Sequence, residues 1–250
     1  LTIAISDLMI GEVVAELNDW VREEMMEGLP AEAVALIAGQ LESDDAVQMI
    51  EDLDADEREA VLAEMEAEDR AAIESALSYP DETAGRLMSR DFVAVPEHLT
   101  VGDLIDYLRI HSKMLGDFFE VFVVDEAHHP VGTCALSGIL TTPRTIALSD
   151  VMKRDQTLIP VMMDQEEVAL MFQKYALISA AVIDGTGRLV GQMTVDDVVH
   201  IISEEAGEDA LLLSGAGDGD INEPIREAYS SRVRWLVANL GTALVASLII

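Results

Sequence analysis

Met88-Ser-Arg-Asp91 recurs 64 positions later as Met152-Lys-Arg-Asp155, and this repetition decides the fold. Pro96 and Pro160 share the same offset. Each copy continues with a helical stretch, an apolar strand that ends in Asp, and a Val-Gly pair; these lie at 101–109, 121–125 and 131–132, and again at 166–173, 180–184 and 190–191. Such a period indicates two packed copies of one supersecondary unit. Each copy reads strand–helix–strand–strand–helix, so we predict two mixed α/β units.

Residues 1–80, ahead of the repeat, predict an all-α superhelical bundle. Pro30 suits the first turn of one helix, and Ser43 can cap the next. Asp54 and Glu57 have the spacing of a capping box at the start of a third helix. Short antiparallel helices joined by tight loops fit this pattern.

The charge balance excludes one class of partner. The 250 residues hold 48 acids against 15 bases, for a net charge of −33. Phosphate binding needs clustered Lys and Arg, so nucleic acid is not expected as a partner. Cations or a basic protein surface fit better. An acidic surface with only three lysines also suits adaptation to high salt, and this alternative stays open.

The C-terminal part predicts a connection to a membrane. Six acids and no Lys or Arg lie between Glu204 and Asp220, and Arg226, Arg232 and Arg234 precede an uncharged apolar run, residues 235–250. These 16 residues fall short of the ~20 that span a bilayer, and the chain has no initiator Met, so we expect a fragment that stops inside a membrane helix. Basic residues beside such a helix place the acidic domains in the cytoplasm.

We therefore expect five segments. They are an acidic helical N domain at 1–80, two α/β units at 81–145 and 146–203, a connecting helix at 204–232, and the start of a transmembrane helix at 233–250. The single cysteine, Cys134, is consistent with a reducing compartment. The five histidines are scattered and form no zinc or catalytic motif, so we do not expect an enzyme.

The paired units resemble a tandem CBS-domain (Bateman) module, since the second closes with Gly191-Gln-Met-Thr-Val-Asp-Asp-Val198. The full order is more specific. The segments are, in order, an acidic helical domain, the Ala84-Gly-Arg-Leu-Met88 motif, two such units, an acidic helix and Arg232-Val-Arg-Trp-Leu236. This order of segments looks like the cytoplasmic part of an MgtE-type magnesium channel or transporter.

This resemblance implies a function and a set of site residues. It implies a homodimer formed through the CBS units, located at the cell membrane, with Mg²⁺ bound between the N domain, the CBS units and a "plug" helix. Matching positions assign the Mg²⁺ ligands as Asp44, Asp164, Glu166, Asp197, Glu205, Glu208 and Asp209. Asp44 is expected to face Asp197, and the other acids are expected near or on the plug helix.

Three positions depart from the family pattern. His200 and Ala176 stand where the resemblance leads us to expect acids, so we expect fewer ion sites. Gly138 replaces the ribose-binding Asp in the first CBS unit, which argues against ATP binding there.

The acids also support a metal-dependent switch on physical grounds. Mg²⁺ prefers oxygen ligands and often takes only one or two carboxylates. Glu205 lies three residues before Glu208 and four before Asp209, which puts these carboxylates on one helix face. Like charges ~4 Å apart repel by roughly 4 kcal/mol at an effective dielectric near 20, so a divalent cation would favour the closed arrangement.

Two other functions are also compatible with the sequence. A generic tandem CBS module could sense adenine nucleotides on behalf of another membrane protein. An acidic scaffold adapted to high salt would bind no specific ligand, and monovalent salt alone would then reproduce any effect of Mg²⁺.

Overall fold

The computed structural model describes residues 14, 17, 19–26, 28–111, 118–214 and 233. The chain divides into two compact units, Leu1–Asp197 and Val198–Ile250. The expected transmembrane start and most of the preceding segment lie outside the described residues. Within the described part, no helix is both long enough and apolar enough to cross a membrane.

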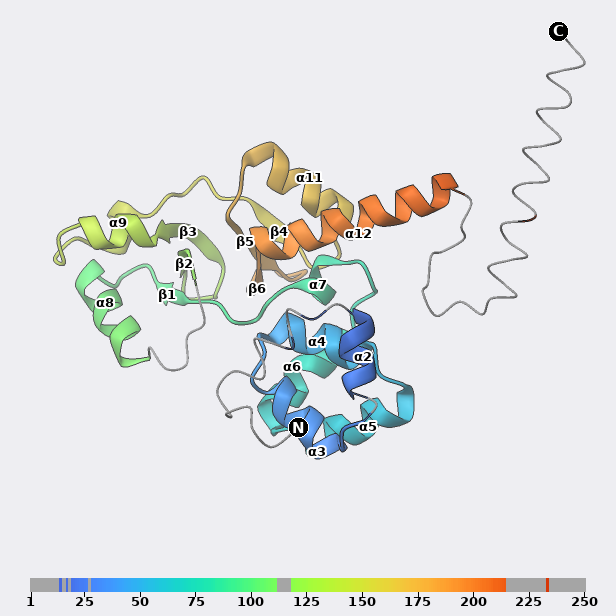
Figure 1. The fold of residues 1–250 in the computed structure, drawn as a ribbon. Helices are drawn as coiled ribbons and strands as arrows, with labels where there is room; N and C mark the ends of the chain where they lie inside the picture. The colour runs from blue at the N-terminus through green and yellow to red at the C-terminus, as the bar shows by residue number, and fades with distance from the viewer. Residues whose placement is uncertain are drawn as a thin grey trace, which may run out of the picture. The chain divides into compact units, whose positions relative to one another are not determined.

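The N-terminal part is a bundle of short helices, as the sequence predicts (Figure 1). The helices are α2 (Asp19–Met26), α3 (Ala31–Ala38), α4 (Ser43–Glu51), α5 (Ala55–Glu64) and α6 (Ala67–Leu77). Their apolar faces bury one core that includes Val34, Met49, Ile50 and Ile73. Acidic residues occupy the first turns of α3 to α6, where the positive end of the helix dipole favours them.

Two details of this bundle correct the sequence predictions. Ser43 is the first residue of α4 rather than its cap, and the N-cap position belongs to Glu42. Asp54 does precede α5, but its side chain makes no capping hydrogen bond. The residue spacing located both helix starts but not the capping hydrogen bonds. At α4 the Ser43 hydroxyl instead accepts a hydrogen bond from the Arg90 N–H, which belongs to a distant segment.

The repeat forms two three-stranded sheets of identical topology (Figure 1). The first repeat unit contains β1 (Ala94–Pro96), α8 (Val101–Ile110), β2 (Glu120–Val124), β3 (Pro130–Ala135) and α9 (Leu136–Thr141). The second contains β4 (Leu158–Pro160), α11 (Gln165–Tyr175), β5 (Ser179–Ile183), β6 (Leu189–Thr194) and the start of α12 (Val195–Ser214). In each sheet the first two strands are parallel and the last two antiparallel. The predicted strand–helix–strand–strand–helix order is confirmed.

The two units are joined crosswise. Ser89, ahead of β1, pairs with Gln192 on β6 of the other unit, and Lys153, ahead of β4, pairs with Thr133 on β3. A short helix, α10 (Leu148–Val151), precedes Lys153. Phe122, Val124, Ala181 and Leu189 are buried together and link the two sheets.

Close packing in this crossed arrangement explains the repeated Met and Gly. A Cβ added at Gly191 would stand 2.5 Å from the Met88 sulfur, and one at Gly132 would stand 2.9 Å from the Met152 sulfur. Each repeated methionine therefore packs on the repeated glycine of the other unit. A side chain at either glycine would push against a neighbouring backbone oxygen as well, which well-packed cores tolerate poorly.

The segment between the bundle and the repeat packs on the second repeat unit. It contains the four-residue helix α7 (Ala84–Leu87). Ala84 N–H donates to the Met163 carbonyl and Gly85 N–H to the Val161 carbonyl, both at 2.8 Å. Residues 84–89 thus form a fixed platform against which α4 packs.

Candidate metal centre

Asp44 and Asp197 meet between the bundle and the second repeat unit. Asp44 lies in the first turn of α4, and Asp197 lies in the first turn of α12. The two carboxyl groups lie close enough for each to affect the pKa of the other, although they come from residues more than 150 positions apart. Two carboxylates can come into direct contact only when a proton lies between them, and a bridging cation could take the place of that proton.

Thr194 fixes the orientation of Asp197. The Thr194 N–H and hydroxyl both donate to Asp197 Oδ2, at 2.9 and 2.7 Å. Because Thr194 ends β6 and Asp197 is three residues further, these bonds form where the strand passes into the helix. One carboxylate oxygen of Asp197 is thereby committed to the turn, and the carboxyl group is held in place before any ligand arrives.

The surroundings disfavour the charged form of both acids. Burial, followed by the negative charges of Asp197 and Asp45, raises the pKa of Asp44 well above its usual value. Burial also raises the pKa of Asp197, against the opposing effect of the Thr194 hydrogen bonds. At the edge of this cluster, partial burial and then the charge of Asp91 raise the pKa of Glu42 to about 7. Each group holds a proton more tightly here than in water.

One oxygen of this pair suits a hydrated cation. Asp44 Oδ1 is buried, and no donor in the structure hydrogen-bonds to it. Buried acceptors without donors are uncommon and call for an explanation such as an ion or a water. Across the described residues no group of three or more His, Cys, Asp or Glu is placed to hold a metal. A pair of carboxylates completed by water fits Mg²⁺ better than ions that need several protein ligands.

Asp164 and Glu166 have a local structural role. Asp164 is the N-cap of α11, and its Oδ1 accepts a hydrogen bond from the Glu166 N–H at 3.0 Å. Asp164 also pairs through its backbone with Thr83 in the segment that carries α7. Metal binding by these two acids stays a prediction.

The predicted plug acids lie on α12. Glu205, Glu208 and Asp209 all fall within its helical range, but the side chains of Glu208 and Asp209 lie outside the described part. Residues from Val198 onward form a unit of their own, so ligation by these acids together with Asp164 and Glu166 also stays a prediction. His200 is exposed on the same helix, and Ala176 ends α11 in a left-handed conformation.

Two contacts of this interface were missed by the sequence reasoning. Asp91 accepts a hydrogen bond from the Ser43 N–H at 2.8 Å, at the N-terminus of α4. Arg86 forms two hydrogen bonds with Glu51 at the other end of the same helix. A signal was present for both, because Arg86 lies in the Ala84–Met88 motif and Asp91 in the repeated Met-Ser-Arg-Asp.

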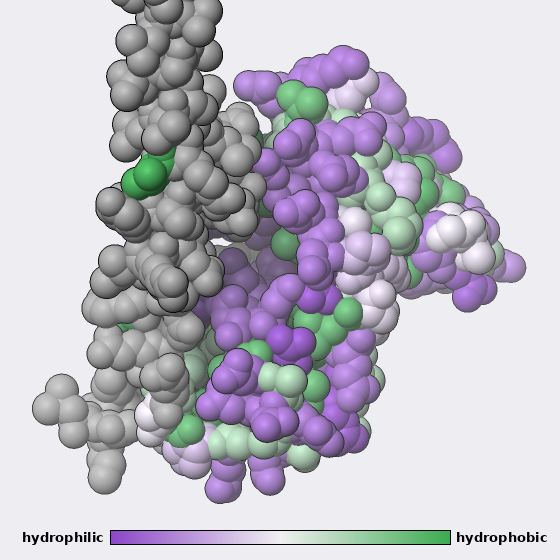
Figure 2. Space-filling view, turned by 90° about the vertical axis from the view of Figure 1, so that its right-hand side faces the viewer, coloured by the Kyte–Doolittle hydropathy of each residue, from purple (hydrophilic) through white to green (hydrophobic). Residues whose placement is uncertain are grey.

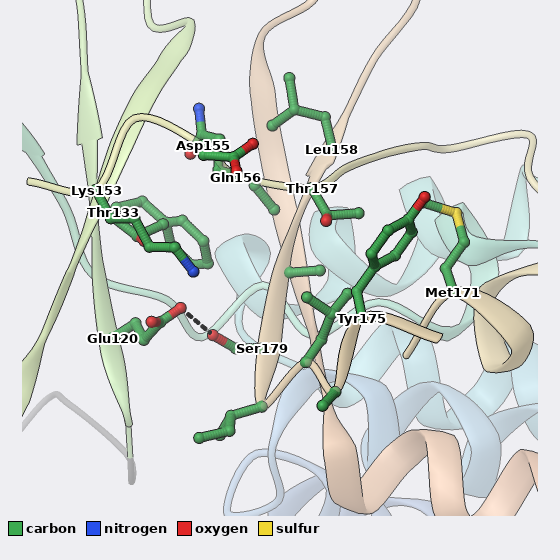
Figure 3. Close-up of a pocket in the computed structure, with 16 residues that line it drawn as sticks. Glu120, Thr133, Lys153, Asp155, Gln156, Thr157, Leu158, Met171, Tyr175 and Ser179 are labelled. Atoms are coloured by element: carbon green, nitrogen blue, oxygen red, sulfur yellow. Dashed lines mark hydrogen bonds between the residues drawn. The ribbon is translucent and has the colours of Figure 1, made fainter. Parts of the chain in front are cut away.

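A separate cavity of about 600 Å³ lies between the two repeat units (Figure 3). This volume is in the range of small-molecule pockets. Its charged lining residues are Glu120, Lys153 and Asp155, and Glu120 accepts a hydrogen bond from the Ser179 hydroxyl at 3.1 Å. The cavity thus presents two carboxylates against one ammonium group.

The described residues on the face drawn in Figure 2 are mostly hydrophilic, with apolar areas between them. This is the pattern expected from the excess of acids. The acids of the Asp44–Asp197 contact differ from this solvated majority because part of their surface is buried.

Comparison with family models gives two matches. Residues 4–82 match the MgtE intracellular N domain, and residues 84–142 and 148–204 match the CBS domain. Neither describes an enzyme.

Two curated relatives are both magnesium transporters named MgtE. The one from Enterococcus faecalis is 31% identical over 66% of this chain and 36% of its own length. The one from Thermus thermophilus is 32% identical over 71% of this chain and 40% of its own length. The chain therefore spans well under two thirds of these relatives.

Solved structures agree with the fold. A structure described as the cytosolic domain of the Mg²⁺ channel MgtE in complex with ATP matches with a TM-score of 0.72, at 27% identity over 76% of this chain and 78% of that one. A structure described as the soluble part of a magnesium transporter matches with a TM-score of 0.76, at 25% identity over 81% and 80%.

Proposed function

Because the chain belongs to the MgtE family, with that family's N domain followed by a pair of CBS domains, we propose that it is the Mg²⁺-sensing and gating region of a membrane Mg²⁺ channel or transporter. In this proposal Mg²⁺ bridges acids between the N domain, the CBS pair and the plug helix, and favours the closed state. The Asp44–Asp197 contact is the observation that carries it.

The proposed mechanism follows from the charge of that contact. With both carboxylates ionised and no cation present, their repulsion opposes docking of α4 on the CBS pair. A Mg²⁺ ion that binds the docked state better than the open state shifts the population toward docking. The buried Asp44 Oδ1, which no donor satisfies, supplies a ligand atom for that ion. The same principle would extend to the plug helix through the other predicted ligands, which are Asp164, Glu166, Glu205, Glu208 and Asp209.

The proposal places the full-length protein in the cell membrane, with this region in the cytoplasm, as a homodimer formed through the CBS domains. Large apolar side chains on the first CBS domain support such pairing. Ile110 is 78% exposed and Leu140 is 71% exposed, on α8 and α9 respectively. Burial of these side chains against a second copy of the chain would remove apolar surface from water.

Millimolar Mg²⁺ should protect this chain from protease and reduce its radius of gyration, because docking of the N domain shields residues 78–83, which connect α6 to α7. The measurement is limited proteolysis and small-angle scattering in EDTA and in a Mg²⁺ titration, with NaCl at matched ionic strength as the control. Equal digestion and scattering with and without Mg²⁺ would contradict the proposal. An equal effect of NaCl would instead favour an acidic scaffold adapted to high salt.

An adenine-nucleotide sensor is the second candidate, favoured by the cavity between the CBS domains and by the ATP complex of a related structure. The carboxylates of Glu120 and Asp155 disfavour a polyphosphate in this cavity. We therefore expect calorimetry in the absence of Mg²⁺ to show that ATP binds more weakly than adenosine, since adenosine carries no phosphate charge. Tight ATP binding in a chain that does not respond to Mg²⁺ would favour the nucleotide sensor over the Mg²⁺ sensor.

A further inference from the structure

Helix α4 carries an ion pair at its C-terminal end that needs no metal. Glu51 accepts two hydrogen bonds from the Arg86 guanidinium, Nη2 to Oε1 at 2.6 Å and Nε to Oε2 at 3.0 Å. Asp81 lies 3.1 Å from the same Nη2. The Arg86 side chain is only 8% exposed, whereas that of Glu51 is 36% exposed. Two-point pairing of arginine with a carboxylate is stronger and more directional than a single contact.

This pair connects the N domain to the CBS pair. Glu51 is the last residue of α4, and the apolar residues of this helix belong to the core of the bundle. Arg86 lies in α7, whose neighbouring backbone groups donate to the carbonyls of Met163 and Val161 in the second CBS domain. The guanidinium is therefore held on the CBS side while its carboxylate partner comes from the N domain.

The N-terminal end of α4 has a second attachment. The Ser43 N–H donates to Asp91 Oδ2 at 2.8 Å, and the Ser43 hydroxyl accepts from the Arg90 N–H at 2.6 Å. A carboxylate at this place satisfies a free helix N–H and lies at the positive end of the helix dipole. Both contacts join the N domain to the segment that leads into β1.

The repulsive Asp44–Asp197 contact therefore lies on a helix that attractive contacts hold at both ends. We propose that Arg86, through its ion pair with Glu51, is a latch that sets the Mg²⁺ concentration at which the N domain docks on the CBS pair. The inference rests on the proposed function and adds the residue that determines its threshold. The latch lowers the amount of Mg²⁺ needed, because it offsets part of the repulsion at Asp44 and Asp197.

Arg86→Gln should raise the Mg²⁺ midpoint of protease protection by about tenfold, as expected when a charge-assisted, two-point contact is lost. Glu51→Gln should raise it by a similar factor. This second variant acts from the more exposed partner, so it does not depend on whether Arg86 can be replaced without harm to folding. The double variant should shift the midpoint no further than the larger single shift, because both changes remove one interaction.

Arg144→Gln is the matched control. Arg144 pairs with Asp106 at 2.6 Å within the first CBS domain, and both side chains are about half exposed. Its loss should leave the midpoint unchanged. Melting of each variant at saturating Mg²⁺ separates a general loss of stability from a changed threshold, since a latch shifts the midpoint even where the melting temperature is kept.

Two results overturn this inference, and they differ from each other. If the unaltered chain shows no Mg²⁺ response, the proposed function fails and the latch fails with it. If the unaltered chain responds but Arg86→Gln and Glu51→Gln keep its midpoint, or add their shifts in the double variant, the latch alone is wrong and Mg²⁺ sensing stands.

Discussion

Asp44→Asn should keep the N domain docked in EDTA and remove most of the Mg²⁺ response. The amide can donate a hydrogen bond to Asp197, so the contact no longer needs a proton or a cation. Two like charges ~4 Å apart cost roughly 4 kcal/mol at an effective dielectric near 20. Because Asp44 is only half-buried, solvent screens part of this repulsion. We expect protease digestion in EDTA to slow by at least tenfold.

Glu59→Gln is the control for this variant. Glu59 is exposed on α5, so the change removes the same charge from the chain without touching the contact. Digestion rate and radius of gyration would be measured for both variants in EDTA and in saturating Mg²⁺. If Asp44→Asn digests faster than the unaltered chain in EDTA, then Asp44 stabilises docking in some other way and the repulsion argument is wrong.

The repeat made the fold of residues 88–198 predictable from sequence. The two copies share Met88 and Met152, and also Gly132 and Gly191, because each methionine packs on the glycine of the other repeat unit. The need for close packing therefore shows in the sequence as repeated residues. The helical bundle was predictable for a similar reason, since its apolar residues recur at helical spacing. The strands β2 and β5 begin one residue earlier than expected, because Glu120 pairs with Ala135 and Ser179 pairs with Thr194.

The site was less predictable because it joins segments that are distant in sequence. Asp44 and Asp197 were paired only through the family resemblance, and nothing in either local pattern separates them from the many solvated acids. Ser43 was expected to cap its own helix, but Arg90 and Asp91 supply its hydrogen bonds. The role of Arg86 could not be predicted from its motif, since its partner Glu51 lies 35 residues earlier.

The raised pKa values predict that protons can replace Mg²⁺. Docking brings Asp44 and Asp197 into surroundings that raise the pKa of each, and Glu42 beside them has a pKa of about 7. The docked state therefore binds more protons than the open state. By linkage, docking is most favourable below the ordinary carboxyl pKa and loses this advantage as the pH rises through the raised values. Once the pH has risen above the raised pKa values of Asp44 and Asp197, the full repulsion opposes docking.

In EDTA, the radius of gyration should consequently be smaller at pH 5.5 than at pH 8, and the midpoint of the Mg²⁺ titration should rise with pH. Scattering is the suitable measurement, because protease activity itself changes with pH. Asp44→Asn separates this cause from others: with one titrating partner removed, the pH dependence should flatten by more than half, whereas Glu59→Gln should retain it. A compact state at pH 8 in EDTA, or an undiminished pH dependence in Asp44→Asn, would show that other groups control docking.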